Sequence, residues 1–172
     1  IRLSESKNKK YSNMCEAAVN SKQISKRLKE LGCPQAKSLI LEFPTEEQVP
    51  KYLLKHWIAG LFDGDGCFCR ILRANRKNSY TCSFVSTTMV CEGLKKFLEK
   101  ELGIHCGIFY KNSTTANLNI SGRIQCYKFL DFIYKDSTIH MNRKYEKYLR
   151  EMVPPHLRPK LSLDSGETCG IV

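Results

Sequence analysis

Two aspartates separated by a single glycine form the part of this sequence most suited to chemistry. Asp63 and Asp65 alternate with Gly64 and Gly66, directly after the apolar run 57–62. A carboxylate at the end of a buried helix, beside glycines that leave the backbone accessible, can hold a metal ion close to a phosphate. Asp-Gly is also a common turn dipeptide, so these four residues alone also describe a solvated turn. The neighbouring elements must decide between the two interpretations.

The segment before the acids has the pattern of a closely packed helix. Within residues 51–62 the apolar positions are 53, 54, 57, 58, 61 and 62, which is helical spacing. Pro50 suits the first helical turn, and Gly64 and Gly66 are expected to end the helix. Gly60 inside a helix costs about 1 kcal/mol, a cost that is offset if a second helix approaches closely there. We therefore expect the acids at the tip of a helix that packs against another helix.

Strands and helices alternate after the acids, and turn or capping residues separate them. The predicted elements are strands 67–73 and 80–87, a helix from Thr87 or Thr88 through Leu102, strands 104–111 and 116–121, a helix capped by Ser121 and running through Tyr134, and a basic helix 142–152. The order is α-β-β-α-β-β-α followed by a short extra helix. One complete unit therefore occupies residues 46–152, and a tail without clear pattern occupies 153–172.

Residues 58–66 carry the most specific motif of the chain, Ile-Ala-Gly-Leu-Phe-Asp-Gly-Asp-Gly. The motif resembles the signature of the LAGLIDADG homing endonucleases, from which Ile58, Phe62 and Gly64 depart. This resemblance implies an α+β fold in which an antiparallel sheet forms a concave DNA-binding saddle and the motif helix lies at the interface between two halves. It also implies a site-specific double-strand DNA endonuclease that uses Mg²⁺ or Mn²⁺, of the intein-associated or free-standing kind.

The first part of the chain, residues 1–45, looks like the back end of a preceding half. Residues 20–24 match residues 120–124, because both segments follow a strand-like run and open an amphipathic helix. Lys37 then corresponds to Lys144, and the spacing puts the matching acid of the first half upstream of this sequence. We expect a fragment of a longer two-motif protein; the alternatives are a first half that has degenerated and a homodimer in which two motif helices meet.

The resemblance also implies roles for individual residues of the motif. Asp65 is the expected metal ligand, helped by the carbonyl oxygen of Gly64, whereas Asp63 has a structural role near the helix end. The metal would polarise the scissile phosphate and lower the pKa of an attacking water. Lys144 and Lys37 are the expected basic residues of the two halves, in contact with the water network or the phosphate near the metals.

The two predicted hairpins carry the side chains expected to read DNA, because a β-ribbon fits the major groove. The candidates are Arg70, Arg73, Arg76, Lys77 and Tyr80 on the first hairpin, Tyr110, Lys111, Asn112, Asn117 and Asn119 on the second, and Arg143 on the last helix. Only one of Arg70 and Arg73 can face DNA if their strand is regular. Arg143 is also the alternative to Lys144 near the metals, since a register shift of one residue exchanges them. Taken singly, each charge could instead protect a sheet edge.

Composition points to a polyanionic partner inside the cell. The net charge is +11, from 28 Lys and Arg against 17 Asp and Glu, and nucleic acid is the leading partner for such a balance. The 9 cysteines are odd in number and include no C-x-x-C pair, so we expect neither a disulfide framework nor structural zinc. No membrane span or signal peptide is visible. We expect a cytoplasmic, organellar or nucleoid protein that is neither secreted nor membrane-bound.

Three other functions remain open from the sequence. The first is a relative that has lost cleavage but still binds DNA or RNA, such as a maturase or a transcription regulator of the same fold. The second is the endonuclease portion of an intein, since Ile1 cannot be a splicing nucleophile and the chain does not end in His-Asn. The third is an unrelated basic RNA-binding protein, although no RNA-module motif is present. Asp65 favours cleavage, because metal chemistry explains an acid at that position.

Overall fold

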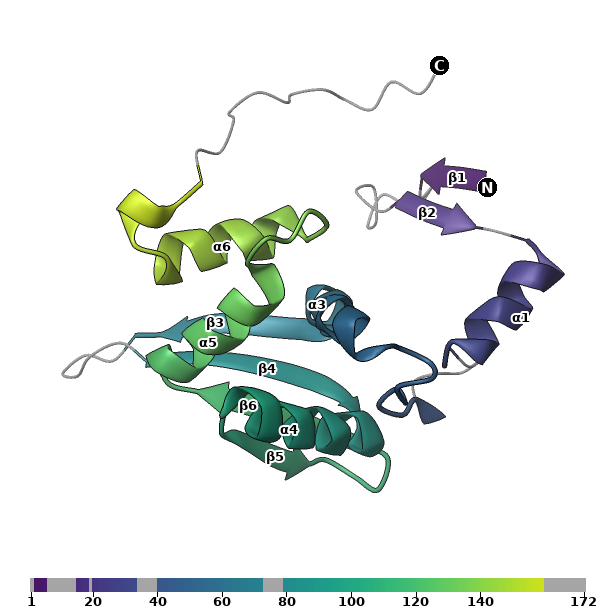
Figure 1. The fold of residues 1–172 in the computed structure, drawn as a ribbon, viewed down its shortest axis with the longest axis horizontal. Coiled ribbons are helices and arrows are strands. Elements are labelled where there is room, and N and C mark those ends of the chain that lie inside the picture. The colour runs from purple at the N-terminus through teal and green to yellow at the C-terminus, as the bar shows by residue number, and fades with distance from the viewer. Residues whose placement is uncertain (1, 6–14, 19, 34–39, 73–78, 160–172) are drawn as a thin grey trace, which may run out of the picture.

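A computed structural model describes residues 2–5, 15–18, 20–33, 40–72 and 79–159 of this chain. The main unit consists of α3 (Lys51–Asp65), β3 (Gly66–Ile71), β4 (Ser79–Thr87), α4 (Thr88–Leu102), β5 (Cys106–Tyr110), β6 (Thr115–Ser121), α5 (Arg123–Tyr134), α6 (Asn142–Met152) and a 3₁₀ turn, η2 (Pro155–Leu157). The predicted order α-β-β-α-β-β-α plus an extra helix is confirmed (Figure 1). Among these described segments, no helix has the length and apolar character needed to cross a membrane.

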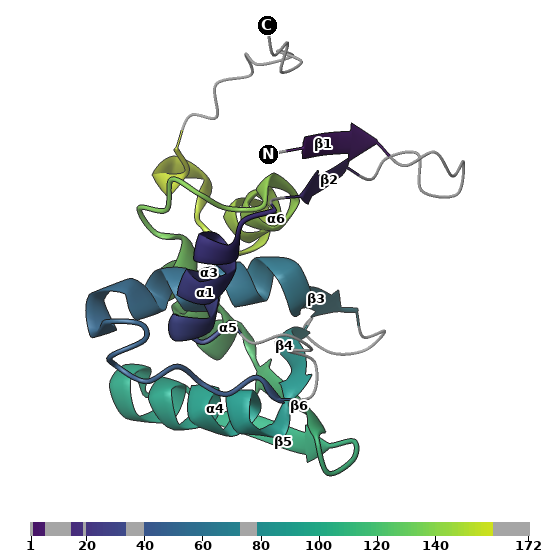
Figure 2. The same ribbon diagram turned by 90° about the vertical axis from the view of Figure 1, so that its right-hand side faces the viewer.

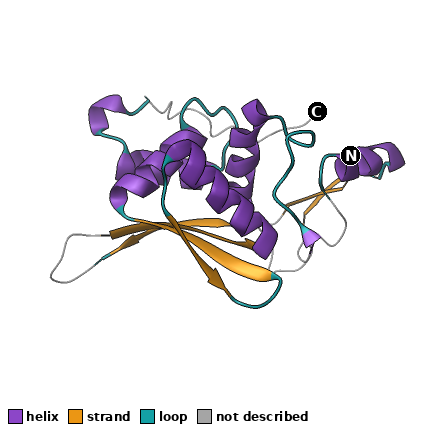
Figure 3. Ribbon diagram, turned by 60° about the horizontal axis from the view of Figure 1, so that its bottom comes forward, coloured by secondary structure: helices purple, strands orange, loops and turns teal. Residues whose placement is uncertain are grey.

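The four strands of this unit form one antiparallel sheet in the order β3-β4-β6-β5. Phe84 on β4 lies in register with Gly66 on β3 and with Leu118 on β6, which fixes the alignment of the three strands. Helices cover one face of the sheet, and the described residues leave the opposite face uncovered (Figure 3). The observed mixture of one antiparallel sheet and helices on one side confirms the α+β prediction.

Alternation along the strands builds the core between the sheet and the helices. Tyr80, Cys82 and Phe84 on β4 are buried, and so are Leu118 and Ile120 on β6, while the side chains between them are more exposed. Helices α4 and α5 pack on this face and add Leu94, Leu98, Phe129 and Ile133, which are 1% exposed or less. One covered and one uncovered face is the usual arrangement of an antiparallel sheet.

Helix boundaries agree with the sequence in one case and differ in two. The Thr87 hydroxyl accepts from the Val90 N–H at 3.2 Å and caps α4, which ends at Gly103 with φ 59°. Helix α5 is preceded by Gly122 with φ 94° and has no side-chain cap, so the predicted Ser121 cap is wrong. Helix α3 ends at Gly66 as predicted, but Gly64 lies within it, so the helix continues to Asp65, beyond the expected range 51–62.

The N-terminal segment contributes a separate two-stranded sheet and one helix. The strands β1 (Arg2–Glu5) and β2 (Cys15–Ala18) pair antiparallel, and Figures 1 and 2 show this hairpin apart from the four-stranded sheet. Helix α1 (Lys22–Glu30) begins at Ser21, whose hydroxyl accepts from the Ile24 N–H at 3.3 Å. The assignment of residues 1–45 to a preceding half stays a prediction.

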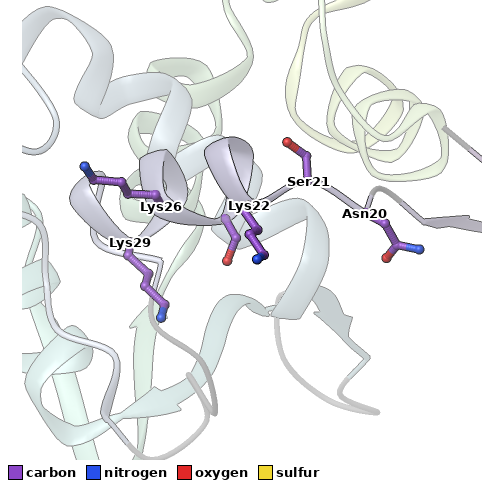
Figure 4. Close-up of a pocket in the computed structure, with 6 residues that line it drawn as sticks. Asn20, Ser21, Lys22, Lys26 and Lys29 are labelled. Atoms are coloured by element: carbon purple, nitrogen blue, oxygen red, sulfur yellow. The ribbon is translucent and has the colours of Figure 1, made fainter.

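Helix α1 has a basic side and an apolar side. Lys22, Lys26 and Lys29 follow one another at helical spacing and border an open hollow with Asn20, Ser21 and Ser25 (Figure 4). Ile24, Leu28 and Leu31 occupy the opposite side by helical periodicity, and they are 47%, 45% and 37% exposed. Nothing in the described part of the chain buries this apolar side.

Candidate functional site

Asp63 anchors the C-terminal end of α3 to the elements behind it. One carboxylate oxygen accepts from the Tyr134 hydroxyl at 2.6 Å, and the other accepts from the Met141 N–H at 2.8 Å. Burial raises the pKa of Tyr134 well above its usual range, and the Asp63 carboxylate raises that pKa further. Hydrogen bonds to a charged group stabilise a fold by roughly 1.5–3 kcal/mol each. Asp63 therefore serves the fold, in agreement with the structural role that the motif implies.

Lys144 holds the same helix end from the first turn of α6. Its ammonium donates to the carbonyl oxygens of Phe62, Asp63 and Gly66, at 2.5, 2.9 and 2.5 Å. Burial lowers the pKa of Lys144, and the nearby Asp63 opposes that shift. A cation suits this position, because the C-terminal carbonyls of a helix carry partial negative charge. Each of the three protons of the ammonium thus has an acceptor within the fold.

The junction between α3 and β3 has no loop and no spare room. Gly66 begins β3 immediately after Asp65, in an extended conformation with φ −82° and ψ 157°. A methyl group on Gly66 would collide with the ring and the carbonyl oxygen of Phe62. Only glycine therefore fits here, and the position of Asp65 is fixed from both sides.

Asp65 is the last residue of α3 and is exposed, unlike Asp63. Within the described residues its carboxylate makes no hydrogen bond and no ion pair. It borders a hollow of about 290 Å³, whose other lining residues are Leu41, Leu61, Val85, Ser86, Thr87 and Thr115. Gly64, also exposed, precedes it, and a methyl group there would meet nothing within 4 Å. The structure thus presents a carboxylate with unused hydrogen-bond acceptors, carried on a fixed stretch of backbone beside the sheet.

These oxygens meet part of what a divalent metal needs. Mg²⁺ binds six oxygens and keeps several waters, so one or two protein carboxylates are normally enough. Asp65 and the Gly64 carbonyl are oxygen ligands of the required kind. Among the described residues, however, no group of three or more His, Cys, Asp or Glu side chains gathers to hold a metal. The remaining ligands would have to come from water, phosphate oxygens or a second acid outside this unit.

The uncovered face of the sheet is polar but uncharged. The register and the burial pattern place these side chains on it: Cys67, Cys69 and Ile71 from β3, Ser79, Thr81, Ser83 and Val85 from β4, Phe109 from β5, and Thr115, Asn117, Asn119 and Ser121 from β6. None of these described strand positions bears a charge. The predicted Asn117 and Asn119 do lie on this face, whereas the expected positive charge of the face must come from its surrounding loops.

Two predicted DNA contacts of the first hairpin lie on the other side of the sheet. Tyr80 is 4% exposed, stacks on Phe68 with ring centroids 6.0 Å apart, and accepts from Arg123 at 3.3 Å. Its assignment to DNA is therefore wrong, because an aromatic residue at a helix-facing strand position fills the core. Arg70 also points to the helix side, where it pairs with Glu151 on α6 at 3.4 Å.

The first hairpin leaves the other part of that prediction open. Only one of Arg70 and Arg73 was expected to face DNA. Because Arg70 faces the helices, Arg73 is the remaining candidate for a DNA contact. Arg73, Arg76 and Lys77 lie outside the described residues, as does Lys37. Their proposed roles stay predictions.

Among the DNA candidates of the second hairpin, some side chains make contacts within the fold and others are exposed. The Asn112 side-chain oxygen accepts from the N–H groups of Thr114 and Thr115, at 2.9 and 2.7 Å, and so shapes the turn. Lys111 is exposed beside it. Tyr110 donates to Glu92 on α4 at 3.1 Å and lies in register with buried Ala116, so it faces the helices and its assignment to DNA is wrong.

Arg143 occupies the exposed position next to Lys144 at the start of α6. Its guanidinium contacts the Met141 sulfur at 3.6 Å, while its neighbour reaches the end of α3. The structure therefore separates the two residues that a register shift would have exchanged: Lys144 points inward and Arg143 lies at the surface.

Sequence reasoning overlooked the uncharged residues of the uncovered face. It selected charged and amide side chains, whereas Thr81, Ser83 and Val85 occupy the same face as Asn119, and Phe109 is 64% exposed there. The period of two along β4 was the available signal, because burying Phe84 necessarily turns Ser83 and Val85 to the opposite face.

Solved structures with a similar arrangement of elements are homing endonucleases. I-TnaI is 19% identical with a TM-score of 0.44, over 56% of this chain and 69% of that one. I-CvuI in complex with the I-CreI target is 17% identical with a TM-score of 0.43, over 57% of this chain and 64% of that one. The LAGLIDADG meganuclease I-AabMI bound to uncleaved DNA is 12% identical with a TM-score of 0.42, over 56% of this chain and 36% of that one.

The likeness to these enzymes is one of fold and assigns no activity to this chain. The chain spans between about a third and two thirds of the length of these three structures. No protein-family model matches the sequence. No curated protein matches it either.

Proposed function

We propose that this chain contains one half of a LAGLIDADG-type double-strand DNA endonuclease, in which Asp65 binds Mg²⁺ or Mn²⁺. The observation that carries the proposal is an exposed carboxylate without a partner among the described residues, at a fixed helix end beside an uncovered sheet. A carboxylate with no structural task, one helical turn from an apolar core, is suited to a ligand from outside.

The anchors around Asp65 supply preorganisation. Asp63 and Lys144 fix the helix end from behind, so the backbone that carries Asp65 need not be ordered when a metal binds. The metal ion, when bound, would polarise the scissile phosphate and lower the pKa of an attacking water. Lys144 already donates to three carbonyls, so its contribution is to position Asp65 and Gly64 rather than to move a proton. The residues of this chain thus hold the acid still while the metal supplies the chemistry.

A second half is needed to complete the site, because this unit brings one exposed acid. The outward side of α3 is suited to a helix partner: methyl groups at Gly60 or Gly64 would meet nothing within 4 Å, and Leu53 is 42% exposed. Glycines one helical turn apart allow two helix backbones to approach closely. The partner helix would come from an upstream half, of which residues 1–45 are the proposed remainder and Lys37 the basic residue, or from a second copy.

Double-stranded DNA would lie against the uncovered face of the sheet. Asn117 and Asn119 can hydrogen-bond to base edges there, and exposed strand side chains of a ribbon alternate at the spacing needed to read a groove. Phosphate neutralisation would come from the rim, from Arg73, Arg76, Lys77, Lys111 and Arg143. This division matches the usual one, in which phosphate contacts position a protein and base contacts give specificity.

The proposal is tested by cleavage of a randomised duplex DNA library with Mg²⁺ or Mn²⁺. When two copies of the parent chain complete the site, we expect them to cut a subset of the library, and Asp65→Asn to bind the same subset without cutting it. Glu47→Gln is the matched control, since Glu47 is exposed before the opposite end of α3. Equal cutting by the parent and Asp65→Asn would refute the role of Asp65. Specific binding of DNA by a parent chain that neither cuts it nor holds Mn²⁺ would instead establish the alternative, a cleavage-inactive binding relative.

A further inference from the structure

We propose that Cys67 and Cys69 form a redox modification site that closes to an intramolecular disulfide when a peroxide reaches the uncovered face. Their Sγ atoms are 3.2 Å apart. The two residues occupy alternate positions of β3, in register with Ser83 and Thr81 of β4, so both side chains stand on the same face. Two thiols that lean toward each other along one edge strand are already oriented for reaction.

The backbone permits a disulfide but does not favour one. Residues two apart in a strand have Cα atoms about 6.8 Å apart, at the upper end of the range that disulfides span. The sulfurs must approach by about 1 Å from their present 3.2 Å to reach bonding distance. The closed form therefore bends β3, and a strained, exposed disulfide is readily reduced. Such a bond is reversible rather than structural.

Accessibility distinguishes this pair from a second pair in the same unit. Cys67 is exposed and Cys69 is half-buried. The thiols of Cys82 and Cys126 are also neighbours, but both residues are fully buried, and the Cys126 thiol donates to the Ile120 carbonyl at 3.4 Å. Both pairs thus offer neighbouring thiols, and only the first is open to a dissolved oxidant. The second pair is an internal control.

The reaction is a two-electron oxidation by one peroxide molecule. The Cys67 sulfur attacks a peroxide oxygen, the O–O bond breaks, and a sulfenic acid and one water form. The Cys69 sulfur then attacks the Cys67 sulfur, the S–O bond breaks, and a second water leaves with the Cys69 proton. A dithiol reductant returns both thiols by exchange.

Closure would act on the candidate metal site, and this step rests on the proposed function. Cys67 follows Gly66, whose carbonyl accepts from Lys144 at 2.5 Å and which lies directly against Phe62. Because Gly66 is tightly packed at the junction of α3 and β3, a bend of β3 at Cys67 must shift Gly66, Lys144 or Asp65. We expect the oxidised protein to cleave DNA more slowly than the reduced protein.

Peptide mapping of the full chain tests the modification without any DNA. Trypsin releases residues 56–70, which contain Cys67 and Cys69 and no other cysteine. After limited hydrogen peroxide and alkylation under denaturing conditions, we expect this peptide to have lost two hydrogens and to carry no alkyl group, and dithiothreitol to restore both alkylation sites. Peptides containing Cys82 and Cys126 should remain unlinked and fully alkylated. Full alkylation of 56–70, or linkage of the buried pair at the same rate, would overturn the proposal.

Variants and a cleavage assay separate this proposal from the proposed nuclease. Cys69→Ser should lose the closed peptide and leave Cys67 as a sulfenic acid that dimedone traps, while Cys91→Ser should close as the parent does. If closure occurs and the reduced parent neither cuts DNA nor holds Mn²⁺ on it, the dithiol site stands and the nuclease proposal fails. If the reduced parent cuts DNA and the closed form cuts at an equal rate, closure does not act on Asp65 and that part of the inference is wrong.

Discussion

Replacing Lys144 by methionine should destabilise the fold far more than the same change at Lys147. Lys144 is 9% exposed and donates to three carbonyls, whereas Lys147 donates to one, that of Phe68, at 2.7 Å. Both ammonium groups also lie over an aromatic ring, at 5.1 and 5.3 Å from the centroids of Phe62 and Phe68. The two substitutions therefore differ mainly in the number of carbonyls that lose the lysine donor, although the Phe62 carbonyl keeps the Gly66 N–H.

The magnitude follows from the carbonyls that lose their donor. A buried acceptor without a donor costs about 1–3 kcal/mol, and such losses are not additive when one group serves all acceptors. Methionine retains the apolar stem, so packing changes little. We expect Lys144→Met to lower the free energy of unfolding by about 3 kcal/mol and Lys147→Met by about 1 kcal/mol.

Urea unfolding followed by circular dichroism measures both values, because the slope with urea also reports whether the surface exposed on unfolding has changed. Equal destabilisation by the two variants would refute the reasoning. It would show that the three contacts of Lys144 do not hold the end of α3. The role near the metals that the sequence predicted for Lys144 would then be favoured.

Two further predictions concern the same helix end and its neighbours. Gly66→Ala should destabilise the protein by about 1–3 kcal/mol, because the added methyl collides with Phe62. Gly64→Ala should stabilise the isolated unit by up to about 1 kcal/mol through helix propensity, because the added methyl meets nothing within 4 Å. Thermal melts compare the two variants, and equal shifts in melting temperature would show that the α3–β3 junction is not tight. Burial raises the pKa of Tyr134 and Tyr148 well above the usual value for a tyrosine, which is about 10, so the folded state keeps protons that the unfolded state releases. Their contribution to stability is complete below pH 10 and is lost as the pH rises above it. Urea midpoints against pH should fall more steeply for the parent than for a Tyr134→Phe variant, and identical slopes would contradict the assignment.

The sequence was most informative where a local pattern fixes a local structure. The helical spacing before Asp63 and the glycines after it predicted α3 at the right place, and the alternation in 80–87 and 116–121 predicted strands that the register of β4 and β6 confirms. These features depend on neighbours within a few residues. They need no knowledge of the rest of the fold.

Direction across the sheet and long-range contacts were harder to predict. Arg70 and Tyr80 were assigned to DNA by side-chain type, although both follow the parity of buried Phe68 in the ladder and therefore face the helices. Lys144 reaches Phe62, 82 positions earlier in the chain. No periodicity shows where a long flexible side chain ends, so its three carbonyl partners could not be derived from sequence.

The central claim is that the exposed carboxylate of Asp65 holds a divalent metal over DNA. Electron paramagnetic resonance of Mn²⁺ in complexes of the chain with a selected duplex measures that contact directly, whether or not the DNA is cut. We predict bound Mn²⁺ in complexes of the parent and of Glu47→Gln, and its loss in complexes of Asp65→Asn with unchanged affinity for the duplex. Equal Mn²⁺ in the parent and Asp65→Asn complexes would contradict the account.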